Sequence, residues 1–339
     1  MISIIICSRY SSLSDNLQAN IFATIGDCKY EIIHIDNSEN SYNIFEAYNL
    51  GVRKSHGDIL CFMHEDIIFH SADWGRKVAW YLSDDDCGAI GVAGGYAILQ
   101  QSDWRLYGKW IVNLIQGYHT IEQDSKYYVS YPKIKVKQPV EVATLDGVWL
   151  CARKEMFDKI SFDESTYDGF HMYDTDICMQ IHNIGKKVLV CDDILLEHIS
   201  EGSYSPSFEK SLDAFHNKWK DFFPIVKTIS LDPWQTKELY QRGEENLKEQ
   251  IELESIKGEL KELFAEKERG HSVRPFTNVE KKIMGKSKYA YCKAVIRDPG
   301  KSFGEVCRNI RPYLRDDCCP HKIKIVLKLM TYRLRMMLK

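Results

Sequence analysis

The sequence predicts an α/β fold in which a mostly parallel sheet is flanked by helices. Two nearly continuous apolar runs, Ile2–Cys7 and Tyr30–Ile35, have the composition of buried parallel strands. A third run, Ile59–Met63, has the same character. Helical segments separate the three strands, and this order predicts right-handed crossovers and a doubly wound half-sheet.

Local signals define the elements between and after these strands. The segment Ser14–Ile25 predicts a helix with Ser14 or Asp15 as its N-cap. Asn43–Ser55 predicts a second helix that stops before Gly57. Further elements are expected at 73–82 (helix), 89–99 (glycine-rich strand), 142–152 (strand interrupted by Asp146-Gly147), 174–185 (helix) and 187–191 (strand).

The composition argues against several classes of protein. The chain has 339 residues and a formal net charge of -3, which gives no reason to expect nucleic acid as a partner. No apolar run reaches membrane-spanning length, and Met1–Cys7 is too short for the apolar region of a signal peptide. The eleven cysteines are scattered without paired CxxC spacings, so we expect reduced thiols in a cytoplasmic protein.

The character of the chain changes after about residue 228. We expect one domain at 1–228, a charged amphipathic helix at 229–270 and a C-terminal extension at 271–339. The last segment, 321–339, has six Lys or Arg, no acid and interleaved apolar residues, which is typical of a helix on a membrane surface. The alternative is a basic helix packed on the core. The charged helix could also support a homo-oligomer.

Polar and acidic residues follow two of the expected strands. His64, Glu65 and Asp66 come directly after the third strand, and Asp36 follows the second. Because open α/β sheets bind ligands at the carboxyl ends of strands, these two ends predict a nucleotide and a divalent cation side by side. For either acid alone, a role in terminating the strand is the alternative. The glycines at 88–95 lack the spacing of a Rossmann or P-loop phosphate site.

Several motifs follow one another in order between residues 1 and 200. They are Cys7-Ser8-Arg9, His34-Ile35-Asp36-Asn37-Ser38, Asn49-Leu50-Gly51, Gly57-Asp58, His64-Glu65-Asp66, Asp146-Gly147 and Tyr173-Asp174-Thr175-Asp176-Ile177-Cys178. This succession resembles the amino-terminal half of inverting, GT-A-type glycosyltransferases of family 2. The resemblance implies a GT-A fold and sugar transfer from a nucleotide-diphosphate sugar to a hydroxyl acceptor. The chain departs from the family pattern at two positions, because His64 replaces the first acid of a D-x-D motif and Tyr173 replaces a glutamate.

The resemblance also implies roles at the nucleotide and the metal. Asp66 is the expected ligand of Mn²⁺ or Mg²⁺, both of which accept oxygen donors, and His198 is a second candidate ligand. His64 is expected to contact the nucleotide ribose or the metal. Asp36 is expected to hydrogen-bond the base or ribose, and Cys7-Ser8-Arg9 to line the same nucleotide site. A structural role for His198, or a turn cap for Asp36, is the alternative.

The remaining candidates concern the reacting sugars. An inverting transfer needs a base to deprotonate the acceptor hydroxyl, and by resemblance Asp174 is that base. Asp176 would support the helix start or contact the acceptor, and Asp146, Gly147 and Trp149 are expected near the donor or acceptor sugar. Tryptophan can stack on a sugar ring, although Trp149 could equally be a core residue. Both helix-start acids could instead only stabilise the positive end of their helix.

The sequence and its resemblance to family 2 together therefore predict a cytoplasmic, metal-dependent glycosyltransferase, and the resemblance alone implies inversion. The basic tail suggests a saccharide or lipid-linked acceptor at the inner face of the membrane, as in surface polysaccharide or glycolipid assembly. The enzymatic rival is a sugar-phosphate nucleotidyltransferase, although Ser8–Ser12 lacks the glycine-rich phosphate loop that such enzymes usually carry. The non-enzymatic rival is an inactive scaffold of the same fold at the membrane. This alternative stays open because His64 replaces an acid of the metal-binding motif.

Overall fold

The chain divides into two compact units. The first comprises residues 1–116 and 130–250, and the second comprises residues 117–129 and 251–339. The computed structural model describes residues 1–100, 103–121, 126–131, 138–202, 204–298 and 301–315, together with positions 322, 324–326, 328 and 329. Among these described residues, no helix is both long enough and apolar enough to span a bilayer.

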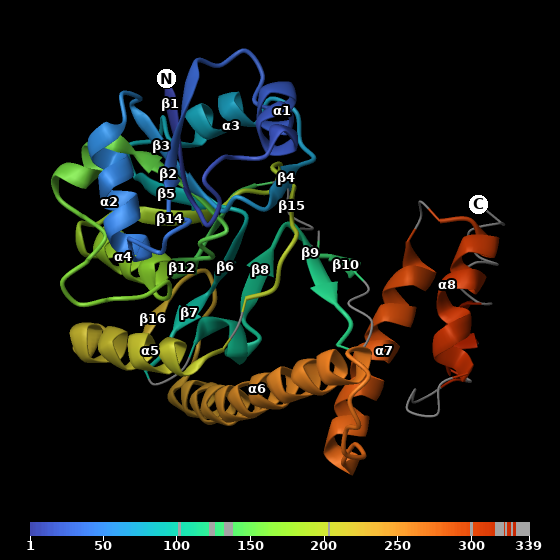
Figure 1. The fold of residues 1–339 in the computed structure, drawn as a ribbon. Helices are drawn as coiled ribbons and strands as arrows, with labels where there is room; N and C mark the ends of the chain where they lie inside the picture. The colour runs from blue at the N-terminus through green and yellow to red at the C-terminus, as the bar shows by residue number, and fades with distance from the viewer. Residues whose placement is uncertain are drawn as a thin grey trace. The chain divides into compact units, whose positions relative to one another are not determined.

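A seven-stranded sheet organises the first unit (Figure 1). Its order is β11-β14-β5-β13-β3-β1-β2. The strands are β1 (Ile2–Ser8), β2 (Tyr30–Asp36), β3 (Ile59–Met63), β5 (Cys87–Gly91), β11 (Val140–Glu141), β13 (Trp149–Arg153) and β14 (Lys187–Val190). β1 runs parallel to β2 and β3, and β14 runs parallel to β5, whereas β11 and β13 are antiparallel to their neighbours. The expected mostly parallel sheet is confirmed.

Successive side chains of the central strands enter two separate cores. Ile5 and Phe62 lie in one core with α2, α4 and α5, and Ile4 and Met63 lie in the other with α1 and α3. The helices are α1 (Asp15–Thr24), α2 (Ile44–Lys54), α3 (Trp74–Tyr81), α4 (Tyr173–Asn183) and α5 (Pro206–Trp219). Because both faces of the sheet are covered, its strands are nearly continuous apolar runs.

The middle of the sheet also buries a pair of thiols. Cys61 on β3 lies opposite Cys151 on β13, and neither side chain is exposed. Burial raises the pKa of Cys151 well above its usual value, and the thiol of Cys61 adds to the rise.

The expected helix starts are confirmed by their caps. Ser14 accepts a hydrogen bond from the backbone of Leu17 at 3.2 Å, and α1 begins at the next residue. Asn43 and Glu46 form a reciprocal capping box at the start of α2. These side chains satisfy amide groups that have no partner inside the helix.

The single glycine-rich strand expected at 89–99 is wrong. The chain forms β5, β6 (Ala93–Gly95) and β7 (Ala97–Ile98), which belong to three different sheets. A Cβ on Gly94 would lie 2.3 Å from the carbonyl oxygen of Thr144. The glycine therefore permits the close approach of another chain segment, as its sequence context suggested.

Three small sheets complete the strand pairing within the described part of the chain. Their orders are β10-β9-β15-β4, β12-β6-β8 and β16-β7. The additional strands are β4 (Ile67–Phe69), β8 (Trp110–Val112), β9 (Leu114–His119), β10 (Lys126–Ser130), β12 (Thr144–Leu145), β15 (Leu196–His198) and β16 (Ile225–Val226). In the first of these sheets, His198 lies opposite Ile67 on β4 and opposite Gln116 on β9. Two short 3₁₀ helices, η1 (Trp104–Tyr107) and η2 (Lys154–Asp158), follow β7 and β13.

The C-terminal region is helical, as expected. It contains α6 (Pro233–Glu268), α7 (Asn278–Arg297) and α8 (Phe303–Arg315). The second unit buries apolar residues of α7 and α8 in a core of its own, and Ile325 and Leu329 are buried there too. Most of the 321–339 segment lies outside the described residues. The burial of two of its apolar side chains fits the alternative of a helix packed on its own unit.

Candidate active site

Three side chains with metal-ligating atoms meet after β3 and at the end of β15. The ligand atoms of His64, Asp66 and His198 lie within 4.8 Å of one another. His64 Nδ1 lies 3.2 Å from His198 Nε2, and Asp66 Oδ1 lies 3.5 Å from the same nitrogen. The distance from Asp66 Oδ1 to His64 Nδ1 is 4.0 Å. Atoms that bind one shared ion at about 2.1 Å have separations of about 3 to 4 Å, which matches this cluster.

The pairing of β15 with β9 determines which nitrogen His198 presents to the cluster. His198 Nδ1 lies 3.2 Å from Gln116 Oε1, while the Gln116 amide nitrogen donates to the carbonyl of Ser200. Because a carbonyl can only accept, the Gln116 oxygen has to face His198, and Nδ1 has to carry a proton. In a neutral ring, Nε2 therefore presents a lone pair to His64 and Asp66.

The charge states of the cluster also suit a divalent cation. Burial and the nearby His198 ring lower the pKa of His64 to about 4, so this imidazole is neutral near pH 7. Burial alone would raise the pKa of Asp66, but its neighbours His198, Ser200 and His64 together hold that pKa well below its usual range. One carboxylate and two imidazole rings form a mixed oxygen and nitrogen donor set, which fits an ion such as Mn²⁺.

Glu65 joins this cluster to the end of β1. Its carboxylate accepts hydrogen bonds from Ser8 Oγ and from Arg9 Nε, the latter at 2.7 Å. The segment expected to bind the nucleotide therefore lies beside the residues expected to bind the metal. The sequence placed both segments at strand ends but did not show the ion pair that joins them.

Asp36 and Cys7 lie at the same edge of the sheet. Asp36 is opposite Ser8 in the β1–β2 register, and its exposed side chain accepts a hydrogen bond from the Ser38 backbone at 2.9 Å. That bond lowers the pKa of Asp36. Burial and the charge of Glu65 raise the pKa of Cys7 to about 11, so its thiol is protonated near neutral pH. Asp36 thus caps a turn and remains accessible to a ligand.

Arg105 connects three carboxylates from three segments of the chain. Its guanidinium donates to Asp103 at 3.0 Å, to Asp146 at 3.1 Å and to Asp174 at 3.2 Å. The Asp103 and Asp174 side chains are 1% and 7% exposed, whereas the Asp146 side chain is 26% exposed. Arg105 also lies over the Trp104 ring, 4.5 Å from its centroid. The expected sugar-site residue Asp146 and the expected base Asp174 are therefore held by one cation.

Asp174 lies in the first turn of α4. Its Oδ2 also accepts a hydrogen bond from the backbone of Gly147 at 2.9 Å, and Oδ1 accepts one from the backbone of Thr175 at 2.8 Å. Burial raises the pKa of Asp174, and Arg105 opposes that rise. Arg105 thus favours the ionised state that a general base needs.

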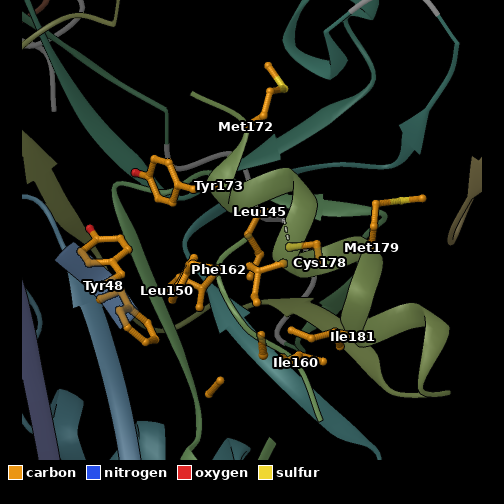
Figure 2. Packing of buried hydrophobic residues seen from close by; sticks show 14 of the residues in the cluster. Tyr48, Leu145, Leu150, Ile160, Phe162, Met172, Tyr173, Cys178, Met179 and Ile181 are labelled. Carbon is orange, nitrogen blue, oxygen red and sulfur yellow. Dashed lines mark hydrogen bonds between the residues drawn. The ribbon is translucent and has the colours of Figure 1, made fainter. Parts of the chain in front are cut away.

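Gly147 allows β13 and α4 to approach closely. A Cβ at this position would lie 2.2 Å from the hydroxyl oxygen of Tyr173. Figure 2 shows Tyr173 beside Tyr48 in the same core, with ring centroids 5.5 Å apart. The hydroxyl oxygen of Tyr173 lies 3.0 Å from His64 Nε2. The Asp146-Gly147 segment, the start of α4 and the His64 cluster are therefore in contact.

Two expected sugar-contacting residues lie away from this site. Trp149 is fully buried and packs against Phe69 and Trp74, so the sugar contact is wrong and the core alternative is correct. Asp176 is 1% exposed, and its carboxylate connects α4 to α5 and neighbouring residues. Its hydrogen-bond donors are Tyr167, Gln180, Lys218 and Trp219. These contacts match the expected support of the helix start and not an acceptor contact.

The sequence did not identify Arg105 or Gln116 as site residues. Arg105 lies in the segment at 100–140, where the sequence pattern predicted neither a strand nor a helix. Gln116 reaches His198 only because β9 pairs with β15, and this pairing joins segments far apart in the chain. Tyr173 was noticed as a departure from the family motif, without a role of its own.

The fold and the site define a class of protein. It is an α/β protein that places a candidate cation site and a buried carboxylate network at the ends of its central strands. The model of the glycosyltransferase-like family matches residues 3–212, and the chain belongs to this family. The family membership agrees with the transferase that the sequence predicts, and the α/β fold class with a mostly parallel sheet is confirmed.

Two solved structures are similar to the chain at low sequence identity. The crystal structure of GalNAc-T7 with UDP, GalNAc and Mn²⁺ is 12% identical, with a TM-score of 0.43 over 66% of this chain and 50% of that chain. The mannosyltransferase PcManGT from Pyrobaculum calidifontis in complex with GDP-Man and Mn²⁺ is 13% identical, with a TM-score of 0.39 over 71% and 73%. The match thus spans half the length of the first structure. No curated protein matches the chain.

Proposed function

We propose that the chain transfers a sugar from a nucleotide-diphosphate sugar to a hydroxyl acceptor, with inversion and with Mn²⁺ or Mg²⁺ as cofactor. The observation that carries this proposal is the convergence of His64, Asp66 and His198 beside the contact between Ser8 and Glu65. A divalent cation held there would stabilise the negative charge of the departing diphosphate.

The other site residues bind the nucleotide and the sugar or move the proton. Asp36 and Cys7-Ser8-Arg9 bind the nucleotide, and the exposed part of Asp146 contacts a sugar. Asp174 takes the proton of the acceptor hydroxyl, whose oxygen bonds to the anomeric carbon as the bond to the diphosphate oxygen breaks. Arg105 supports this step because it stabilises the carboxylate form of Asp174.

Two substitutions test these roles. Asp66→Ala and Asp174→Asn should each lower the rate of sugar transfer by about 100-fold or more, the scale of losing a cofactor ligand or a general base. Asp168→Asn is a matched control, because its side chain is 73% exposed and forms an ion pair with Lys210 at the surface. Circular dichroism would verify that each variant is folded. Unchanged transfer rates in both site variants would remove the mechanism.

The donor class can be found with a thermal-shift screen. UDP- and GDP-linked sugars are each added to the protein with and without Mn²⁺. At least one of them should raise the melting temperature of the protein only when Mn²⁺ is present. Release of pyrophosphate from a nucleoside triphosphate and a sugar phosphate would favour the nucleotidyltransferase. Failure of UDP and GDP to bind in calorimetry with Mn²⁺ present would favour the inactive scaffold.

We also propose a cytoplasmic location at the inner face of the membrane, with a saccharide or lipid-linked acceptor. Residues 281–339 contain sixteen Lys or Arg and four Asp or Glu, a balance that favours anionic lipid headgroups. Sedimentation of the full chain with anionic vesicles should exceed that of a chain truncated before His321. Equal sedimentation of the two would refute contact through 321–339. Analytical ultracentrifugation would test the homo-oligomer that α6 suggests.

A further inference from the structure

The two positions at which this chain departs from the family motif are in contact. His64 follows β3, and Tyr173 is the first residue of α4, 109 residues later. The hydroxyl oxygen of Tyr173 lies 3.0 Å from His64 Nε2. The tyrosine is 8% exposed and the His64 side chain is 37% exposed, so the contact is partly buried. Because these two departures from one motif share a partly buried hydrogen bond, we expect His64 and Tyr173 to have a joint role.

A metal-binding histidine usually donates its second N–H to a neighbouring acceptor, which fixes the ring orientation and its tautomer. His198 has such an acceptor in Gln116. In His64, Nδ1 faces the other ligands and Nε2 faces Tyr173. When the Tyr173 oxygen accepts a hydrogen bond from Nε2–H, His64 Nδ1 is left with a lone pair for a cation.

A hydroxyl suits this position because it can donate as well as accept. Without a cation, His64 Nδ1 and His198 Nε2 lie 3.2 Å apart, so one of them has to carry a proton. Gln116 accepts a hydrogen bond from His198 Nδ1, so Nε2 of a neutral His198 ring carries no proton. The proton between the two rings then lies on His64 Nδ1, and the Tyr173 hydroxyl donates to His64 Nε2. In the tautomer that can bind a cation, the ring proton lies on Nε2 and the same hydroxyl accepts it.

The surroundings of Tyr173 hold its hydroxyl in one place. Its ring packs edge-on against Phe45 and Tyr48, with centroids 6.4 Å and 5.5 Å away (Figure 2 shows Tyr48). On another side Gly147 leaves room for the hydroxyl, since a Cβ there would lie 2.2 Å from its oxygen. A side chain restrained in this way can impose one orientation on the ring that it contacts.

We infer that Tyr173 is a positioning residue that keeps His64 oriented with Nδ1 toward the cation, so that His64 and Tyr173 act as one unit. The inference rests on the proposed metal site, but it does not require that sugar be transferred. Because Asp174 follows Tyr173 in the same helical turn, the pair also ties the cation site to the segment that carries the proposed base.

Tyr173→Phe tests this inference, since it removes the hydroxyl and keeps the packed ring. Mn²⁺ alone is titrated into the metal-free, full-length protein, without donor or acceptor, in an isothermal titration calorimeter. The affinity for Mn²⁺ should fall about 10- to 100-fold, the usual effect of losing a residue that orients a metal-bound histidine. Tyr167→Phe is the matched control, because it deletes another buried hydroxyl of the same core, which donates to Asp176 at 3.0 Å. The affinity of the Tyr167→Phe variant for Mn²⁺ should equal that of the wild type.

A double-mutant cycle separates positioning from a general loosening of the core. In a His64→Ala background, which retains Asp66 and His198, Tyr173→Phe should cause no further loss of Mn²⁺ affinity. Three results would overturn the inference: an unchanged affinity in Tyr173→Phe, an equal loss in Tyr167→Phe, or the same loss in the His64→Ala background. A wild-type protein that binds no Mn²⁺ would overturn it as well. A protein that binds Mn²⁺ but transfers no sugar would refute only the proposed function.

Discussion

Replacement of Arg105 by glutamine should destabilise the first unit, because it leaves three carboxylates without their shared cation. Two of them, Asp103 and Asp174, have side chains that are 1% and 7% exposed. Removing one partner of a buried ion pair costs about 3–5 kcal/mol. A third of the Arg105 side chain is exposed, so we expect the lower end of this range, about 3 kcal/mol.

For a folded unit of about this size, a loss of about 3 kcal/mol lowers Tm by about 6–12 °C. Differential scanning calorimetry of the metal-free protein would measure the change at several pH values. Burial raises the pKa of Asp174, and Arg105 is the main group that opposes this rise. Without Arg105 the carboxyl is more easily protonated. The destabilisation caused by Arg105→Gln should therefore be largest above the folded-state pKa of Asp174, and it should decrease as the pH falls and Asp174 becomes protonated.

The control removes a lysine from an exposed ion pair. Lys210 and Asp168 have side chains that are 70% and 73% exposed, so Lys210→Gln should leave Tm unchanged. Arg105→Lys should lie between wild type and Arg105→Gln, since it keeps the charge but loses the planar fork of donors. If the Tm of Arg105→Gln lay within about 2 °C of that of the wild type, the ion pairs of Arg105 with the three carboxylates would not stabilise the fold as proposed.

Three further substitutions probe other contacts. Gly147→Ala should cost about 1–3 kcal/mol, measured by urea unfolding, because the new Cβ would meet the Tyr173 hydroxyl at 2.2 Å; an unchanged midpoint would contradict this. Asp176→Asn should lower Tm in calorimetry, since it neutralises a carboxylate that is 1% exposed and accepts from four side chains. The hydrogen bond from Arg274 lowers the pKa of Glu280 from 4.5 to about 2, so Glu280 contributes stability above pH 4.5 that is lost as the pH falls through 2. The Tm difference between wild type and Glu280→Gln should therefore shrink over this interval, and a constant difference would argue against the ion pair.

The sheet could be predicted because its strands carry their signal locally. Ile4 and Ile5 point to opposite faces and are both fully buried, so the run is apolar throughout. The division of 89–99 into three strands could not be predicted in this way. It depends on the approach of Thr144 to Gly94, a contact between residues fifty positions apart.

The same distinction holds for the site. Asp66 could be proposed because a strand end marks it in the sequence, and Asp174 because a helix-start motif resembles that of a known family. Arg105 owes its role to three carboxylates that converge only in the folded chain, so no local pattern identifies it. Trp149 shows the opposite error, because an aromatic residue in a strand has the same pattern whether its ring faces a ligand or the core. Here its position on the strand turns it toward Phe69 and the helices behind the sheet.

The thiols buried between β3 and β13 give the chain a native reporter of local opening. Alkylating reagents attack thiolates, and burial keeps the thiols of Cys61 and Cys151 inaccessible, with the pKa of Cys151 well above its usual value. Labelling at these two positions, followed by peptide mass spectrometry, therefore records how often the central strands separate. Because β3 leads directly into His64, binding of Mn²⁺ should slow the labelling. The occupancy of the candidate metal site could thus be followed on unmodified protein, without any measurement of catalysis.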